Sequence, residues 1–187
     1  MVGTASGSVQ TLFDFTRLDE LSGWTEHSDT VKPSGASKAA LVLQKSQLFQ
    51  RAVFFSLFAP RINGTGFAGI RADTSFDLRE HQYIAIKCRG QGANFKYKML
   101  LRHKGLGRDS VIYGQIFTVS ENEFSTVKLP LGDFKPYHRG LPLAADVHPL
   151  DLSAITSMGI KVDNGPYLPD NQPGVSSLEI DWIKAVK

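Results

Sequence analysis

The chain has 187 residues, of which 42% are hydrophobic and 21% charged, and its formal net charge is +3. This composition excludes an intrinsically disordered chain, and the length suits a single all-β sandwich domain. Because Cys88 is the only cysteine, no disulfide can form within the chain. No apolar run reaches the roughly eighteen residues of a transmembrane helix. The small excess of basic residues is too dispersed to predict nucleic-acid binding.

The N-terminal residues are small and polar. We expect residues 1–8 to form a flexible tail and residues 9–187 to form one domain. This segment has neither the apolar core of a secretory signal nor the Arg-rich amphipathic pattern of a transit peptide.

A two-residue periodicity runs through most of the chain. In residues 95–102 the apolar side chains alternate with Lys96, Lys98 and Arg102. Since successive side chains of a strand point to opposite faces, this segment predicts one buried face and one solvated cationic face. The same alternation in residues 83–89 places Cys88 in the core, as an inert apolar side chain.

Alternation and turn residues together predict further strands. The run 52–58 is apolar at nearly every position, which predicts a central strand covered on both faces. The last strand is expected at a sheet edge or with one face buried, and residues 77–81 and 150–155 could each form a helical turn. The remaining predicted strands are 10–15, 40–43, 51–58, 66–72, 112–119, 125–129, 157–162 and 177–185.

The predicted fold is therefore an all-β sandwich of two antiparallel sheets. Two long connections, 131–151 and 164–175, separate predicted strands, and such loops commonly carry recognition residues.

Catalytic and metal-binding patterns are missing from the sequence. The five histidines do not stand at metal-ligand spacing, and no nucleotide-binding or nucleophile motif occurs. Glu179 and Asp181 share one face of a predicted strand, but we interpret them as solvated carboxylates rather than a catalytic pair. We predict no catalytic residues, no metal and no cofactor.

Several motifs, in this order and spacing, resemble the complex I intermediate-associated protein 30 domain family. The resemblance covers about residues 10–187. Its motifs are Phe13-Asp14-Phe15, Trp24, Ser28–Val31, Gly66–Arg71, Cys88–Gly92, Tyr97, Val127–Leu131, Phe134–Pro136, Arg139-Gly140 and Ser177–Ile183.

This resemblance implies a galactose-binding-like jelly roll and a protein-binding role like that of the mitochondrial complex I assembly factor. It implies partners among complex I subunits or assembly factors, and a mitochondrial location. A cytoplasmic location stays equally open because no transit peptide is seen. The segment Lys32–Ser37 lacks the double glycine that the family usually has there, which puts the family role of this turn in doubt.

Two interpretations of the matched polar residues remain open. Arg71 and Arg89 could pair with Asp29 or Asp181 and join strands. Alternatively, Asp29, Arg71 and Arg139 could form a binding patch with neighbouring loops.

The galactose-binding-like fold also implies an alternative function, that of a carbohydrate-binding module. Loop-end aromatic and polar residues would then form the sugar site, namely Tyr137, His138, Arg139, Tyr167 and Asp170. Domains of this fold often hold a structural calcium ion, to which Asp14 and Asp181 could contribute oxygen ligands.

Overall fold

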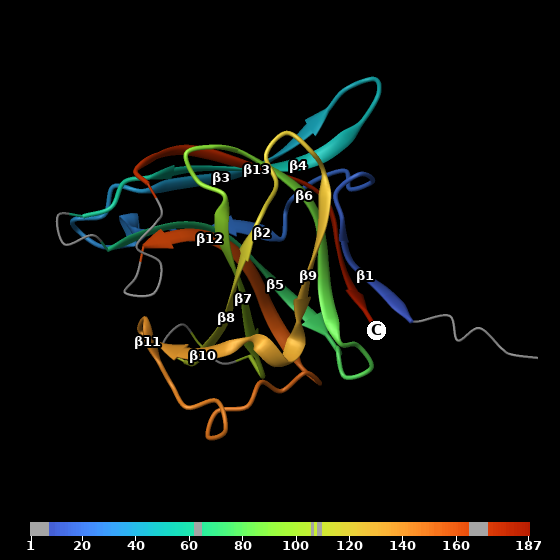
Figure 1. Ribbon diagram of the computed structural model, residues 1–187, viewed down its shortest axis with the longest axis vertical. Coiled ribbons are helices and arrows are strands. Elements are labelled where there is room, and N and C mark those ends of the chain that lie inside the picture. Colours follow the sequence, from blue (N-terminus) through green and yellow to red (C-terminus); the bar gives the residue numbers. More distant parts are fainter. Residues whose placement is uncertain (1–7, 62–64, 106, 108–109, 165–171) are drawn as a thin grey trace, which may run out of the picture.

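The computed structural model describes residues 8–61, 65–105, 107, 110–164 and 172–187. Over these residues, antiparallel strands form two sheets that face each other (Figure 1). The six-stranded sheet runs in the order β3 (Lys38–Lys45), β4 (Gln50–Phe58), β13 (Gly174–Val186), β6 (Tyr83–Gly92) and β9 (Ser125–Pro130), and β1 (Val9–Asp14) also pairs with β13. The seven-stranded sheet runs in the order β11 (Leu141–Pro142), β10 (Lys135–His138), β8 (Ile112–Thr118), β7 (Lys96–His103), β12 (Ile155–Asn164), β5 (Gly66–Phe76) and β2 (Trp24–Glu26).

The core lies between the two sheets, where alternate side chains of the facing strands meet. Phe54 and Ile180 from one sheet and Met99 and Ile160 from the other are fully buried. Cys88 is also fully buried, as predicted. Removing this much apolar surface from water is the main stabilising contribution to such a fold. The predicted all-β sandwich of two antiparallel sheets is confirmed.

Every strand expected from alternation is present, with ends shifted by a few residues. The two expected helical turns are wrong: the described helical turns are η1 (Asp29–Val31) and η2 (Leu131–Asp133). The long connection 131–151 contains β10 and β11, which are too short for periodicity to reveal.

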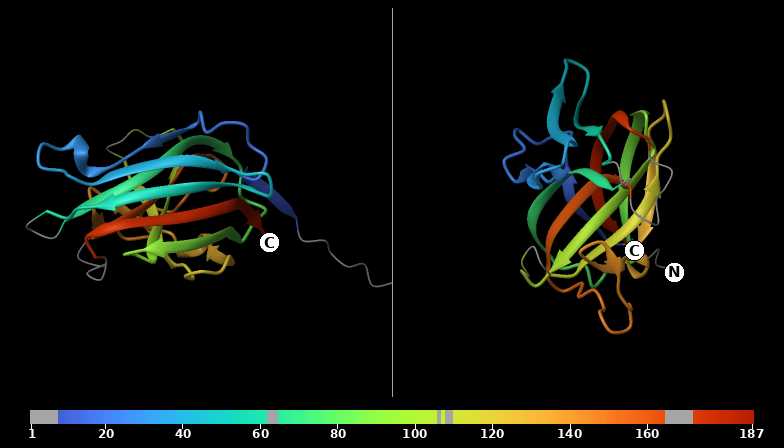
Figure 2. Two further views of the ribbon diagram at one scale, coloured as in Figure 1. Left: turned by 90° about the horizontal axis from the view of Figure 1, so that it is seen from above. Right: turned by 90° about the vertical axis from the view of Figure 1, so that its left-hand side faces the viewer.

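Two strand placements differ in part from expectation: of the two alternatives for the last strand, the buried face is present, with Leu178 and Ile180 fully buried, but the edge position is not. β13 is central, because β6 pairs with one of its edges while β4 and β1 share the other. Figure 2 shows β13 lying between its neighbours, beside the N-terminal strand. The run 52–58 is covered on one face only, since Phe55 and Leu57 remain 46% and 44% exposed. An apolar run therefore predicted the strand correctly but not a second covered face.

Among the described residues no helix has the length and apolar character needed to cross a membrane.

Candidate functional site

The outer face of the seven-stranded sheet carries a net positive charge. Core side chains such as Ile70, Ile160 and Met99 alternate with outward positions on β5, β12 and β7. Six cations and two carboxylates stand at these outward positions and give a net charge of +4, whereas the whole chain carries only +3. We call this surface the cationic face; its charged residues are Arg71, Asp73, Lys96, Lys98, Arg102, Lys135, Lys161 and Asp163.

A buried carboxylate organises the middle of the cationic face. Asp163 Oδ2 accepts hydrogen bonds from Lys161 Nζ at 2.7 Å and from Lys98 Nζ at 3.1 Å, and its side chain is 9% exposed. Burial raises the pKa of Asp163, but the two ammonium groups outweigh it and leave the pKa below its ordinary value. Burial lowers the pKa of Lys98, whose side chain is 13% exposed. The prediction of a solvated cationic strand face is therefore wrong at Lys98.

Aromatic rings flank this group of charges. Lys161 Nζ lies 5.4 Å from the ring centroid of Phe67, and Lys98 Nζ lies 5.4 Å from that of Tyr137. Lys98 reaches Tyr137 across β8 at Gly114, where a Cβ atom would lie 3.1 Å from Lys98 Cδ. The missing side chain at Gly114 thus lets the lysine lie flat along the sheet.

Beside this group lies a cavity of about 320 Å³. Arg71 and Asp73 of β5, Ser157 of β12 and Arg102 of β7 line it. A smaller hollow of about 20 Å³ above Gly159 shares Arg71, Arg102 and Ser157 with it. The two form one polar depression on the cationic face.

The predicted site residues lie in different surroundings. Arg71 and Tyr137 both lie on the cationic face, but on β5 and β10, which β12, β7 and β8 separate. His138 ends β10, and Arg139 follows it with a φ of 50° in the turn to β11. Tyr167 and Asp170 lie outside the described residues.

Asp29 lies in the interior, with 1% of its surface exposed. Its carboxylate accepts hydrogen bonds from the backbone nitrogen of Ser37 at 2.9 Å, from Ser37 Oγ at 3.0 Å and from the backbone nitrogen of Phe67 at 3.2 Å. These contacts join η1 and the start of β3 to β5. This environment favours the interpretation of Asp29 as a residue that ties segments together.

The outer face of the six-stranded sheet differs in character. Val42, Phe55, Leu57 and Val175 are 42%, 46%, 44% and 62% exposed. Cross-strand register places Leu57 opposite Val175 and puts Val42 on the same face of the neighbouring strand. We call these four residues the apolar patch.

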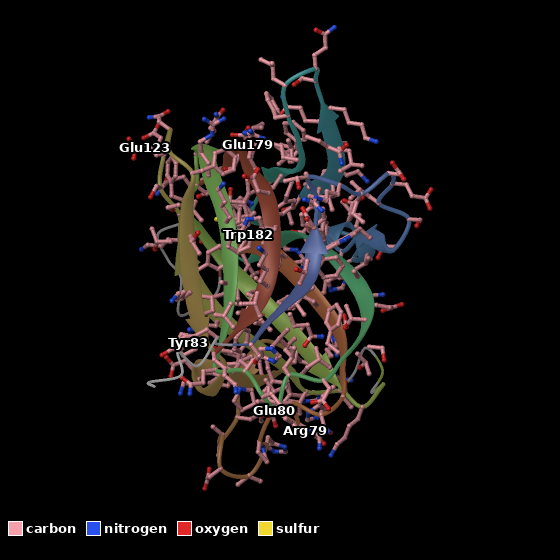
Figure 3. All side chains as sticks on the ribbon, turned by 90° about the vertical axis from the view of Figure 1, so that its right-hand side faces the viewer. Arg79, Glu80, Tyr83, Glu123, Glu179 and Trp182 are labelled. Atoms are coloured by element: carbon pink, nitrogen blue, oxygen red, sulfur yellow. The ribbon has the colours of Figure 1, made fainter. Side chains whose placement is uncertain are left out.

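An ionic cluster lies farther along β4 and β13 on the same face. Glu179 accepts hydrogen bonds from Arg51 Nη1 at 3.1 Å and from Arg89 Nε at 2.5 Å, and Asp181 Oδ2 lies 3.2 Å from Lys87 Nζ. Burial raises the pKa of Glu179, but the two arginines hold it below its ordinary value. Figure 3 shows Glu179 and Trp182 along the same strand.

The interpretation of Glu179 and Asp181 as solvated carboxylates is therefore wrong, since their side chains are 9% and 15% exposed. Arg89 pairs with Glu179 rather than with either predicted partner. No group of three or more metal-ligating side chains occurs within the described ranges. The two carboxylates named above as possible calcium ligands have other neighbours. Asp14 accepts a hydrogen bond from Thr16, and Asp181 lies beside Arg51 and Lys87.

The sequence analysis missed Lys161, Asp163, Phe55 and Leu57. Lys161 and Asp163 do occupy alternate positions near the end of a predicted strand, which indicated a shared face. Their contact with Lys98 depends on the pairing of β12 with β7, and no local sequence pattern indicates that pairing.

Residues 13–180 match the model of the family described as complex I intermediate-associated protein 30 (CIA30). Among curated proteins, no sequence matches this chain significantly.

Solved structures share the fold at low sequence identity. The family 11 carbohydrate-binding module from Clostridium thermocellum, in complex with a β-1,3-1,4-mixed-linked tetrasaccharide, is 17% identical with a TM-score of 0.69, covering 98% of this chain and 97% of that one. The family 30 carbohydrate-binding module of a Clostridium thermocellum cellulosomal cellulase is 11% identical with a TM-score of 0.56, and the match covers 95% of this chain and 96% of that one. The agarase AgWH50C is 9% identical with a TM-score of 0.59, covering 96% of this chain but 24% of the agarase.

These likenesses establish the fold as the galactose-binding-like jelly roll of carbohydrate-binding modules. The family match spans most of the chain and agrees with the motifs quoted above. The chain belongs to the complex I intermediate-associated protein 30 family.

Proposed function

We propose that this chain is a protein-binding module of the assembly-factor type, and that the apolar patch is its contact surface. Family membership supports a role in complex I assembly. The observation that carries the proposal is the exposure of Phe55 and Leu57 on neighbouring outward positions of one strand. Contiguous exposed apolar side chains on a sheet face are typical of surfaces that bind other proteins.

The ionic cluster beside the patch supports the same role. Arg51 lies over the rings of Phe49 and Phe124, at 4.1 and 4.4 Å from their centroids, while it also pairs with Glu179. These contacts hold β4 in place where the apolar patch begins. A partner would then meet a preorganised surface, which reduces the entropy lost on binding.

The test is affinity capture of the full chain from mitochondrial extract, with the recovered proteins identified by mass spectrometry. We expect complex I subunits or assembly factors to be recovered. The double variant Phe55→Ser/Leu57→Ser should lose most of them, because it removes exposed apolar area without opening the core.

The matched control is Ile116→Ser, which changes a 38% exposed side chain on the opposite sheet. This variant should recover the same proteins as the unmodified chain. Failure to recover any complex I protein, or equal recovery by the double variant, would contradict the proposal.

The compartment follows from the same family role. We propose a mitochondrial location, and fluorescence microscopy of the tagged full-length protein tests it. A cytosolic signal would instead direct the search for partners to the cytosol.

A second candidate function is carbohydrate binding on the cationic face. It is supported by the polar depression there, by the ring of Tyr137 and by the fold shared with a module that binds a β-1,3-1,4-linked tetrasaccharide. Titration calorimetry with that tetrasaccharide tests it. Saturable heat that Tyr137→Ala abolishes would favour this function, and an absence of heat would remove it.

A further inference from the structure

The polar depression contains an arginine whose charge the rest of the structure does not balance. Arg71 is half-buried on β5, and within the described parts of the chain its guanidinium has no hydrogen bond or ion pair. Other partly buried cations of the molecule do have partners. Lys98 and Lys161 bind Asp163 on the cationic face, and Arg89 binds Glu179 on the other sheet. A guanidinium presents several N–H donors, and those of Arg71 are not used within the described structure, so they are available to a ligand in the cavity.

A second guanidinium faces the same cavity from β7. Arg102 Nη1 donates to the carbonyl oxygens of Gly107 and Ser110 and to Ser110 Oγ, at 3.1 to 3.3 Å. These bonds restrain the side chain beside the depression. Arg71 is level with Gly159 of β12 and Arg102 with Ser157, so the backbones of the two arginines are roughly 12 Å apart, which two long side chains can span.

The strand between them carries no side chain at one outward position. Gly159 stands opposite Arg71 on one side and Leu100 on the other, so no side chain rises there. Ser157 offers a hydroxyl, and Thr156 Oγ1 is held by the backbone nitrogen of Gly105 at 2.9 Å. The described lining of the larger cavity is thus mostly polar, whereas Leu100 and Ile112 also line the smaller hollow.

Charge and size together indicate the ligand class. Among the described lining residues two arginines outweigh one carboxylate, Asp73, and the whole cationic face adds a positive field. The volume of about 320 Å³ is at the lower end of the range for small-molecule sites. A guanidinium binds carboxylate and phosphate groups through paired hydrogen bonds, while Asp73 and Ser157 can bond hydroxyl groups.

We propose that the depression between Arg71 and Arg102 binds a small hydroxylated molecule through one carboxylate or phosphate group. This site lies on the opposite sheet from the apolar patch, so it does not depend on the proposed protein-binding function. Arg71 supplies the main contact to the anionic group, and Arg102 supplies a fixed second charge.

The test is ¹⁵N NMR titration of the full chain at low salt with glucuronate, glucose 6-phosphate and glucose. Glucuronate and glucose 6-phosphate present the carboxylate and the phosphate on the same sugar ring, and glucose presents neither. At least one anionic probe should shift the amide signals of Gly105, Thr156 and Ser157 saturably below about 10 mM. The probe with the stronger response identifies the anionic group, and glucose should leave these signals in place.

Arg71→Gln should weaken this binding by about tenfold or more, because it removes the charge-assisted bonds. Lys128→Gln removes an equal charge from the six-stranded sheet and should have no effect. Should Arg71→Gln lose the dispersed spectrum of a folded chain, Arg71→Lys keeps the charge without the paired donors and should still weaken binding. Phe55→Ser/Leu57→Ser should bind the anion normally, which separates this site from the proposed function.

Four results would overturn the proposal. One is an equal response to glucose, and another is no saturable response to either anionic probe. The third is unchanged affinity in a folded Arg71→Gln or Arg71→Lys variant. A hexaglutamate peptide that binds more tightly than both sugars would likewise overturn it, in favour of an acidic protein segment.

Discussion

Asp163 shows how one residue determines the state of its neighbours. Its carboxylate is nearly buried, and its Oδ2 atom accepts from both Lys98 and Lys161. Two cations that lie along a sheet would repel each other without this negative charge between them. The same residue therefore holds Lys98 in place beside the ring of Tyr137.

Asp163→Asn should lower the free energy of unfolding by about 2 kcal/mol, because the two lysines lose their counter-charge while Lys98 remains largely buried. Urea denaturation at neutral pH measures the change. Asp133→Asn, at an exposed position of η2, is the matched control and should leave stability nearly unchanged. Equal stability of the two variants would contradict a stabilising role for Asp163.

The pH dependence has a defined sign at this residue. Because the pKa of Asp163 is lowered on folding from 3.8, its contribution is complete above that value and is lost as the pH falls through the folded pKa. Acid titration of stability should therefore be shallower in Asp163→Asn than in the unmodified chain. Parallel acid titrations would contradict this assignment.

At the scale of elements, the connection after β11 is held to the seven-stranded sheet by side chains of β7 and β8. His103 Nδ1 accepts from the backbone nitrogen of Asp151 at 2.8 Å, and Tyr113 Oη donates to the carbonyl oxygen of Pro149 at 3.2 Å. The two rings also pack together, with centroids 5.1 Å apart. A long loop is thus ordered by a few contacts from a rigid sheet.

His103 should make this loop sensitive to acid. Burial and the nearby Lys104 lower the pKa of His103 from 6.5, outweighing the opposing effect of Asp151. The neutral form is favoured on folding, so its contribution is complete above 6.5 and is lost as the pH falls from there toward the lower folded value. Hydrogen exchange of the Asp151 amide should accelerate relative to its intrinsic rate over that interval.

His103→Asn keeps an acceptor oxygen near the position of Nδ1 but does not titrate in this range. In this variant the protection of the Asp151 amide should be nearly independent of pH. A pH dependence as steep as that of the unmodified chain would assign the effect to another group.

At the scale of the whole molecule, the two sheets enclose one core and present two unlike outer faces. The charged residues of the cationic face sum to +4 and those of the whole chain to +3, so the other charged residues sum to −1. The apolar patch lies on the other sheet. This division allows two ligands of different chemistry to bind without competing for the same surface.

Cys88 provides a test of how tightly the whole sandwich is closed. Its side chain is fully buried between the sheets, and burial, with a smaller effect from Asp181, raises the pKa of its thiol to about 12. A thiol reagent should therefore label it only when the sandwich opens, at a rate that follows the unfolding rate as denaturant is added.

The control is Leu48→Cys, since Leu48 is 93% exposed in the β3–β4 turn and a thiol there should react at once. Rapid labelling of Cys88 in the native chain would show that the two sheets separate locally. Such opening would contradict the closed core described above.

Part of the candidate site could be anticipated from the sequence. The motif Gly66–Arg71 drew attention to Arg71, and the loop containing Tyr137 was expected to carry recognition residues. The role of Asp29 could not be decided from the sequence, because its hydrogen-bond partners Ser37 and Phe67 come from separate segments of the chain. Lys98 was expected in solvent, since alternation shows which face a side chain occupies but not what covers that face.

The sequence by itself determined the strands, the two-sheet sandwich, the buried position of Cys88 and the family. All of these follow from local alternation or from motif order along the chain. Only the tertiary structure decided which strands are neighbours, and hence the central position of β13, the Lys98–Asp163–Lys161 contact and the cavity beside Arg71. Strand pairing depends on the free energy of long-range contacts summed over whole sheets, which no short segment of the sequence contains.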